Sequence, residues 1–261
     1  RFNWQTPILL SSHNQDILYM GSEFLQRSMN QGETWERISG DLTNGAKEGN
    51  VAFGTISTIS ESKFQFGLLY TGSDDGKIHV SKDGGVSWQL ISGNLPQNLW
   101  VSRVVASSHK KERVYATLNG YRSDNFESYA FVSDDFGATW TSISNGLTQA
   151  VNVIVEDSAN ENILYVGTDN GLFISIDKGT TWQDFSNGMP KVAVHDAVIQ
   201  TKAKELIVGT HGRSIYKVDI SKVQEVTKEV LAKNLHLFKV NDRTKSDRWG
   251  TQNYAWGKPS E

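Results

Sequence analysis

Short apolar runs alternate with polar turns along most of the chain, and the runs return in a fixed order. Each cycle opens with one strand-like run and continues with a second run that ends in glycine or another small residue. Alternation of this kind over a few residues is typical of β-strands. The first runs lie at 8–10, 55–59, 103–106, 151–155 and 194–199, and the second runs at 17–21, 68–72, 114–117, 163–167 and 206–209.

A motif of eight residues follows the second run in most cycles. Residues 81–88 read Ser-x-Asp-x-Gly-x-Ser/Thr-Trp, residues 133–140 and 175–182 match this pattern, and residues 28–35 have Asn30 in place of the aspartate. The starts at 28, 81, 133 and 175 are separated by 53, 52 and 42 residues. A period in this range indicates a repeated supersecondary unit.

The motif predicts a tight turn between two strands. An aspartate or asparagine side chain can accept hydrogen bonds from nearby backbone amides, and glycine accepts a positive φ. We therefore predict a β-hairpin at each copy, with the tryptophan packed beside it. Catalysis does not need four equivalent copies of one residue, so our interpretation of Asn30, Asp83, Asp135 and Asp177 is structural.

Each cycle thus contains four short strands, and repeated units of about 40–50 residues with four strands are typical of propeller blades. We predict an all-β fold, a β-propeller of four-stranded antiparallel blades. Four complete blades are expected at 8–39, 55–92, 103–144 and 151–186, and a fifth at 192–218 has three strands and no such turn. Five blades that begin in the middle of the pattern indicate part of a larger ring.

The pattern changes after residue 218. Apolar residues recur at helical spacing behind Asp219 or Ser221, which predicts a short helix to about Lys233. Residues 235–240 could form one strand. We interpret residues 241–261 as an irregular tail that leads to a missing domain.

Composition narrows the function classes. The net charge of -3 and the absence of basic runs give no electrostatic case for nucleic acid. The lack of cysteine excludes disulfides and thiolate chemistry, no apolar run is long enough to cross a membrane, and no cofactor is implied. The chain begins at Arg1 without a methionine or signal peptide, which we interpret as a fragment, so this absence does not bear on localisation.

The loop between the second and third strands of blade three is the main candidate for recognition. Residues 119–128 make it about seven residues longer than its equivalents. In a propeller this loop shares a face with the channel mouth, where ligands bind, whereas the Ser-x-Asp turns lie on the opposite face. Tyr121, Arg122 and Asp124 are therefore candidate ligand-binding residues. The alternative is a solvated loop or a contact with a missing neighbour.

Polar and aromatic residues in or beside the inner strands form a second group of candidates. They could converge on the channel, or they could simply bond to one another and to water. The two histidines lack the spacing of a metal pair, and we predict no metal site. The residues are Trp100, Arg103, His195, Asp196, His211 and Arg213.

Glycoside hydrolysis is the catalytic alternative that we consider, and no nucleophile elbow or phosphate loop is present. That reaction needs two suitably separated carboxyl groups. Nothing in the sequence pairs any two of the aspartates on the ligand side, so the catalytic residues stay unknown, with Asp124 and Asp196 as weak candidates. The aspartates considered are Asp41, Asp74, Asp75, Asp124, Asp169 and Asp196.

The four turns resemble the Asp-box, or BNR, repeat of sialidase-like and sortilin-like (VPS10-type) propellers. Wider stretches are similar to large secreted bacterial proteins with tandem propellers of this type. That resemblance implies a preceding propeller region and a following β-sandwich as partners. The nucleophile pair of sialidases cannot be placed here, xyloglucan hydrolases use aspartates from two propellers, and sortilin-type propellers bind peptides without catalysis. The stretches are 4–8, 38–43, 100–103, 120–124, 194–196, 210–215 and 237–238.

The sequence therefore predicts a non-catalytic binding propeller, secreted or in the cell envelope of a bacterium. Its ligand would be a polypeptide or a glycan, held by the loops on the channel side. Two alternatives stay open, a glycoside hydrolase acting on a polysaccharide and a scaffold subunit of a cell-envelope complex.

Overall fold

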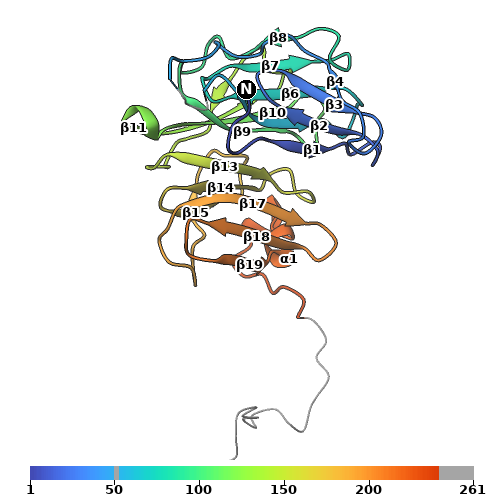
Figure 1. The fold of residues 1–261 in the computed structure, drawn as a ribbon. Coiled ribbons are helices and arrows are strands. Elements are labelled where there is room, and N and C mark those ends of the chain that lie inside the picture. The colour runs from blue at the N-terminus through green and yellow to red at the C-terminus, as the bar shows by residue number, and fades with distance from the viewer. Residues whose placement is uncertain (50–52, 241–261) are drawn as a thin grey trace, which may run out of the picture. The chain divides into compact units, whose positions relative to one another are not determined.

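The strands of the computed structural model, which describes residues 1–49 and 53–240, form five antiparallel sheets (Figure 1). Four sheets have four strands and one has three, each in chain order, so the predicted propeller of four-stranded blades is confirmed. Blade one contains β1 (Ile8–Leu10), β2 (Leu18–Gly21), β3 (Leu25–Ser28) and β4 (Glu36–Arg37), and blade two contains β5 (Ile56–Glu61), β6 (Leu69–Ser73), β7 (Ile78–Ser81) and β8 (Gln89–Leu90). Blade three contains β9 (Trp100–Ala106), β10 (Val114–Gly120), β11 (Asn125–Ser133) and β12 (Thr141–Ser142). Blade four contains β13 (Val151–Glu156), β14 (Leu164–Thr168), β15 (Gly171–Ser175) and β16 (Gln183–Asp184), and blade five contains β17 (Val194–Gln200), β18 (Glu205–Thr210) and β19 (Ile215–Asp219).

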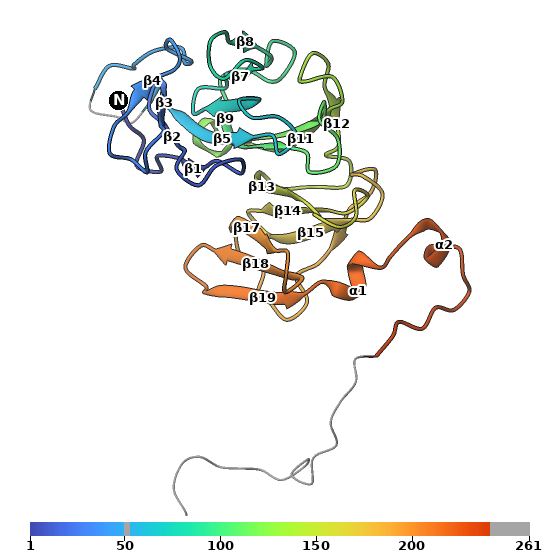
Figure 2. The ribbon, with the colours of Figure 1, turned by 90° about the vertical axis from the view of Figure 1, so that its right-hand side faces the viewer.

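The blades pack face to face in chain order. The inner strands β1, β5, β9, β13 and β17 each contact the next one (Figure 2). A separate cluster of buried apolar side chains fills the space between each pair of neighbouring blades. Residues 1–225 form one compact unit, and the described residues from 226 to 240 belong to a second.

The Ser-x-Asp turns have the geometry that their sequence predicts. In the copy at 81–88, the Gly85 amide donates to Ser81 Oγ at 2.8 Å, and the Ser87 amide donates to Asp83 Oδ1 at 2.9 Å. The Ser87 hydroxyl, which donates to Asp83 Oδ2 at 2.6 Å, and the Ser87 amide hold the pKa of the Asp83 carboxyl below its usual value. The glycine has a φ of 97°, which explains why no other residue stands there.

In blades two to four, the tryptophan of the turn ties its blade to the preceding one. Trp88 Nε1 donates to the carbonyl of Ile38 at 3.0 Å, and Trp140 and Trp182 donate in the same way to Ile91 and Ile143. Trp35, in the first blade, donates instead to a carbonyl of its own turn, that of Gly32. The repeated motif therefore closes a hairpin and also joins neighbouring blades.

A second kind of link between blades, which we name the clasp, occurs at alternate junctions. In the clasp between blades three and four, Glu156 accepts hydrogen bonds from Tyr115 Oη at 2.9 Å, from Ser107 Oγ at 2.8 Å and from the Ser108 amide at 2.5 Å. His109 Nε2 also bonds to the carbonyl of Asp157 at 2.7 Å. Three of these four contacts recur between blades one and two, where Ser11 and Tyr19 donate to Glu61 and His13 bonds to the carbonyl of Ser62.

The other two junctions lack this clasp. Tyr70 and Tyr165 are the equivalents of the clasp tyrosines, and their buried hydroxyls have no partner among the described residues. The register explains why, because the next blade carries Ala106 or Ile199 at the position of the clasp glutamate. These junctions rely on apolar packing instead.

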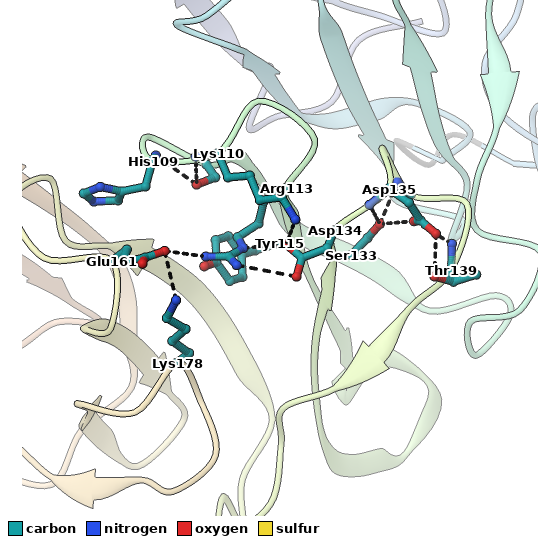
Figure 3. A network of polar contacts seen from close by, with 12 residues as sticks. His109, Lys110, Arg113, Tyr115, Ser133, Asp134, Asp135, Thr139, Glu161 and Lys178 are labelled. Atoms are coloured by element: carbon teal, nitrogen blue, oxygen red, sulfur yellow. Dashed lines mark hydrogen bonds and ion pairs between the residues drawn. The ribbon is translucent and has the colours of Figure 1, made fainter. Parts of the chain in front are cut away.

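Blades three and four are also joined by an ion-pair network around Arg113 (Figure 3). Arg113 is 8% exposed and occupies a position that is apolar and buried in the other four-stranded blades. Its Nε lies 2.7 Å from Asp134 Oδ1, and its Nη1 lies 3.3 Å from Glu161 Oε2, which Lys178 also contacts. This buried cation is therefore matched by carboxylates from both blades.

In blade five a single turn of helix stands in place of the Ser-x-Asp turn and its tryptophan. Helix α1 (Ser221–Gln224) follows β19 directly. Ile220 is fully buried, Val223 packs in the same apolar cluster, and Gln224 Nε2 donates to Asp157 at 3.0 Å. The helix thus covers the core at the junction of blades four and five.

The segment after blade five differs from the predicted single helix to about Lys233. It contains two one-turn helices, α1 and α2 (Lys228–Leu231), the latter in the second unit. The break falls at Thr227, which adopts an extended conformation and caps α2 by accepting a hydrogen bond from the Val230 amide. The strand considered at residues 235–240 is absent from the structure, and its apolar side chains at Leu235 and Leu237 are exposed, with no partner strand within the described residues. The tail at 241–261 lies outside the described residues.

We expect His79 in β7 to make stability fall in mild acid. Burial lowers its pKa from the usual 6.5 to about 4, and its Nδ1 has no partner in the described part of the chain. Between pH 6.5 and 4, His79 takes up a proton in the unfolded chain but stays neutral in the folded chain. The free energy of unfolding therefore falls by up to about 3 kcal/mol. Denaturant unfolding at pH 7, 5.5 and 4 should show that the free energy of unfolding falls less with pH in His79→Phe than in the wild type. An equal fall in the two proteins would contradict the prediction.

Candidate ligand-binding site

Residues of all five blades line a cavity of about 900 Å³, which we name the large cavity. Blades one and two contribute an aliphatic wall, and blades three to five contribute most of the charged and hydrogen-bonding groups. The lining residues are Gln5, Pro7, Ile8, Leu9, Ser57, Thr58, Ile59, Trp100, Ser102, Arg103, Asn119, Tyr121, Arg122, Asn152, Asp169, Ala193, His195, Asp196 and His211.

A β-bulge in each inner strand of blades two to five aims one residue at this cavity. The register shifts between Ile56 and Thr58, and equivalent shifts occur in β9, β13 and β17. The extra residues are Ser57, Ser102, Asn152 and His195, and all four line the large cavity. Bulges re-aim side chains in this way beside functional sites.

The bulge residues change their role from blade to blade. Ser57 and Ser102 donate to the carbonyls of Val101 and Val151 in the next blade, at 2.7 and 2.9 Å. Asn152 instead accepts from Asn119 Nδ2 at 2.7 Å and donates to Asp169 Oδ1 at 2.8 Å. The first two residues therefore brace the fold, while the third belongs to a polar chain along the cavity wall.

Two further pairs of side chains belong to the polar wall of the large cavity. Arg103 Nη2 lies 2.6 Å from Asp196 Oδ1, which joins blade three to blade five. The rings of His195 and His211 lie 5.1 Å apart between centroids. Burial, followed by the proximity of His211, lowers the pKa of His195, which favours the neutral imidazole. Within the described residues no group of three or more acidic or histidine side chains could hold a metal ion.

The extended loop of blade three reaches this site, as the sequence predicts. It contains a 3-10 turn, η1 (Tyr121–Ser123), anchored by a hydrogen bond from the Tyr121 amide to Asn119 Oδ1. The Arg122 guanidinium lies over the Trp100 indole, 3.9 Å from its centre, in a cation–π contact. Tyr121 is 62% exposed and packs edge-on against Phe126.

The structure gathers most of the candidate residues and leaves two outside. Seven of them line the large cavity: Trp100, Arg103, Tyr121, Arg122, His195, Asp196 and His211. Asp124, which ends η1 in the left-handed conformation with a φ of 54°, is not among the lining residues. Arg213 is exposed and also does not line the cavity. Whether any of these residues binds a ligand stays a prediction.

The sequence did not single out Ser57, Ser102, Asn119 or Asn152. The bulges that direct three of these side chains toward the large cavity cannot be recognised from the apolar pattern, because a strand with one extra residue still has the pattern of a strand. Small polar residues at the same place in neighbouring inner strands were the available signal.

Comparisons with known proteins support the fold. The family model described as Sortilin, neurotensin receptor 3 (Sortilin-Vps10) matches residues 23–151, and no curated protein matches the chain. An ancestral GH74 enzyme is similar at 18% identity with a TM-score of 0.64, over 84% of this chain and 30% of that one. The GH74 xyloglucanase from Xanthomonas campestris is similar at 16% identity with a TM-score of 0.64, over 85% of this chain and 37% of that one. The β-propeller domain of Myceliophteria thermophila Cps50 (Swd1) is similar at 15% identity with a TM-score of 0.63, over 87% of this chain and 69% of that one.

These likenesses show a β-propeller and do not extend to activity, because identities this low are shared by propellers of different function. The chain spans only 30% and 37% of the two GH74 enzymes. No helix in the described part of the chain is long and apolar enough to cross a membrane.

Proposed function

We propose that this chain binds a polypeptide in the large cavity without changing it chemically. The observation that carries the proposal is the composition of the cavity wall. Aliphatic side chains such as Ile8 and Ile59 stand opposite arginine, histidine and amide side chains. A peptide offers apolar side chains and backbone hydrogen-bonding groups together, so it can use both walls.

Arg122 favours a peptide over a glycan. Its guanidinium covers one face of Trp100, which leaves the exposed ring of Tyr121 as the main aromatic face open to a sugar. No ion pair of Arg122 is present among the described residues, so its remaining N–H groups are available for a carbonyl or carboxylate of the ligand. The match to a family described as a neurotensin receptor agrees with a binding role, and with a secreted or cell-envelope location.

Hydrolysis of a polysaccharide is the rival function, and the xyloglucanase among the similar structures is the reason to test it. A glycosidase needs two carboxyl groups on either side of the bond to be cleaved. The large cavity has Asp169 and Asp196, and each already accepts a hydrogen bond, from Asn152 and Arg103 respectively. No pair of unengaged carboxyl groups among the described lining residues supports catalysis.

A peptide library displayed on phage tests the proposal directly. We expect selected peptides to bind the wild type, and Arg122→Ala to weaken binding at least tenfold, because a charged hydrogen bond contributes about 1.5–3 kcal/mol. Lys217→Ala, which changes an exposed cation outside the cavity, is the matched control and should bind as the wild type does. Binding to a glycan array with no selected peptide, or release of reducing ends from xyloglucan, would overturn the proposal.

A further inference from the structure

Asp169 differs from the other acidic residue in the wall of the large cavity, because it has no cation beside it. It lies in the loop between β14 and β15 and is half-buried. Asp196 forms an ion pair with Arg103, whereas Asp169 forms none among the described residues. Its Oδ1 accepts a hydrogen bond from Asn152 Nδ2 at 2.8 Å, and its Oδ2 has no partner in the described part of the chain. One carboxylate oxygen in the cavity wall is therefore free to accept.

Asp74 occupies the equivalent position in blade two and shows how the fold can use such a carboxylate for itself. The amide of Asp74 donates to the carbonyl of Thr55 at 2.9 Å, and the amide of Asp169 donates to that of Ala150 at 3.1 Å. Asp74 is buried and accepts four hydrogen bonds, among them one from Thr55 Oγ1 at 2.6 Å. Ala150 has no hydroxyl to donate. The carboxylate of blade four is therefore not held against its inner strand as that of blade two is.

A chain of hydrogen bonds across blades three and four ends at Asp169. The Tyr121 amide donates to Asn119 Oδ1 at 2.8 Å, Asn119 Nδ2 donates to Asn152 Oδ1 at 2.7 Å, and Asn152 Nδ2 donates to Asp169. Every donor in this chain points toward the carboxylate, which is its last acceptor. Asp169 is therefore held in place before a ligand arrives, and this lowers the entropy that binding costs.

The charges along the cavity wall leave Asp169 uncompensated. Burial and the proximity of His211 lower the pKa of His195, whereas the carboxylate of Asp169 raises it, so the charge of Asp169 acts on blade five. Arg122, in blade three, lines the same cavity but lies over Trp100 and has no ion pair among the described residues. The cavity thus offers a ligand one cation and one anion, on neighbouring blades.

We propose that Asp169 binds a cationic group of the ligand that carries N–H donors. The ammonium of a lysine side chain, the guanidinium of arginine and the amino terminus of a peptide share this chemistry. Each can donate to the free Oδ2, and a hydrogen bond with a charged partner is roughly twice as strong as a neutral one. The inference rests on the proposed function and adds to it the charge that the bound peptide carries.

Selection of one phage-displayed peptide library on the wild type, on Asp169→Asn and on Asp184→Asn tests this inference. Asp184 is an exposed carboxylate in β16 of the same blade and does not line the cavity, so Asp184→Asn is the matched control. We expect lysine or arginine to be enriched in peptides selected on the wild type and on the control, and not in those selected on Asp169→Asn. Asparagine keeps the shape of the side chain and an oxygen for Asn152, and thermal unfolding checks that this variant is folded.

Changes in a selected peptide identify the source of the cation. Replacing its basic residue with norleucine should weaken binding to the wild type about tenfold, and binding to Asp169→Asn less than twofold. If acetylation of the amino terminus has this effect instead, the cation is the terminal amine. If peptides bind but neither change acts differently on the wild type and on Asp169→Asn, the inference about Asp169 is wrong while the proposed function stands. If the library yields no binder on any of the three proteins, the proposed function fails and this inference fails with it.

Discussion

Replacing Glu156 with alanine is expected to lower the free energy of unfolding by about 3–5 kcal/mol, one of the largest effects of any single change in this chain. Glu156 is 7% exposed and accepts hydrogen bonds from Tyr115, Ser107 and the Ser108 amide. The substitution leaves these donors buried without an acceptor and opens a void at the junction of blades three and four. Denaturant unfolding measures the loss, and Glu156→Gln, which keeps one acceptor oxygen, should lose less.

The chain contains matched controls for this clasp. Glu161 is a half-exposed carboxylate at the same junction, so Glu161→Ala should cost under about 1 kcal/mol. Tyr115→Phe removes a bonded hydroxyl and should cost about 1–2 kcal/mol, whereas Tyr70→Phe removes an unpartnered one and should be neutral or stabilising. Equal losses for the two tyrosine variants would show that the clasp does not stabilise the junction.

The number and order of blades could be predicted because the signals are local. The turn motif, the small residue that ends each second strand and the alternation within each strand all lie within a few residues of one another. The clasp could not be predicted in this way. Ser-Ser-His occurs at 11–13 and again at 107–109, and the glutamates stand at 61 and 156, yet their contacts join residues more than 40 positions apart.

The sequence could predict the positions of candidate residues that follow from the order of strands and loops. It could not predict contacts that depend on how neighbouring strands pair. The loop with Tyr121 and Arg122 reaches the cavity because loops between second and third strands lie on that face. His195 and Asp196 are neighbours in an apolar run, and only a bulge allows both to line one cavity. Arg103 was a candidate for the same cavity, but its pairing with Asp196 across blade four depends on two such bulges.

Gly72→Ala is the second change for which we expect a large effect, a loss of about 1–3 kcal/mol or more. A Cβ on Gly72 would lie 2.4 Å from Val101 Cγ1 in the next blade and 2.8 Å from Thr58 Cγ2. These contacts are too short, and neither branched side chain can move freely because both residues are buried. The inner strand of the next blade packs closely against the end of the second strand, which explains why the second strand ends in a small residue.

Gly209 is the matched control, because no further blade packs on blade five within the described residues. A Cβ there would meet only Asp196 of the same blade, at 3.7 Å, so Gly209→Ala should be neutral or slightly stabilising through the unfolded chain. The double variant Gly72→Ala with Val101→Ala should recover part of the loss relative to the sum of the two single variants. Thermal unfolding of the wild type and these four variants tests the prediction. If Gly72→Ala and Gly209→Ala are equally stable, close packing of neighbouring blades is not what requires glycine at this position.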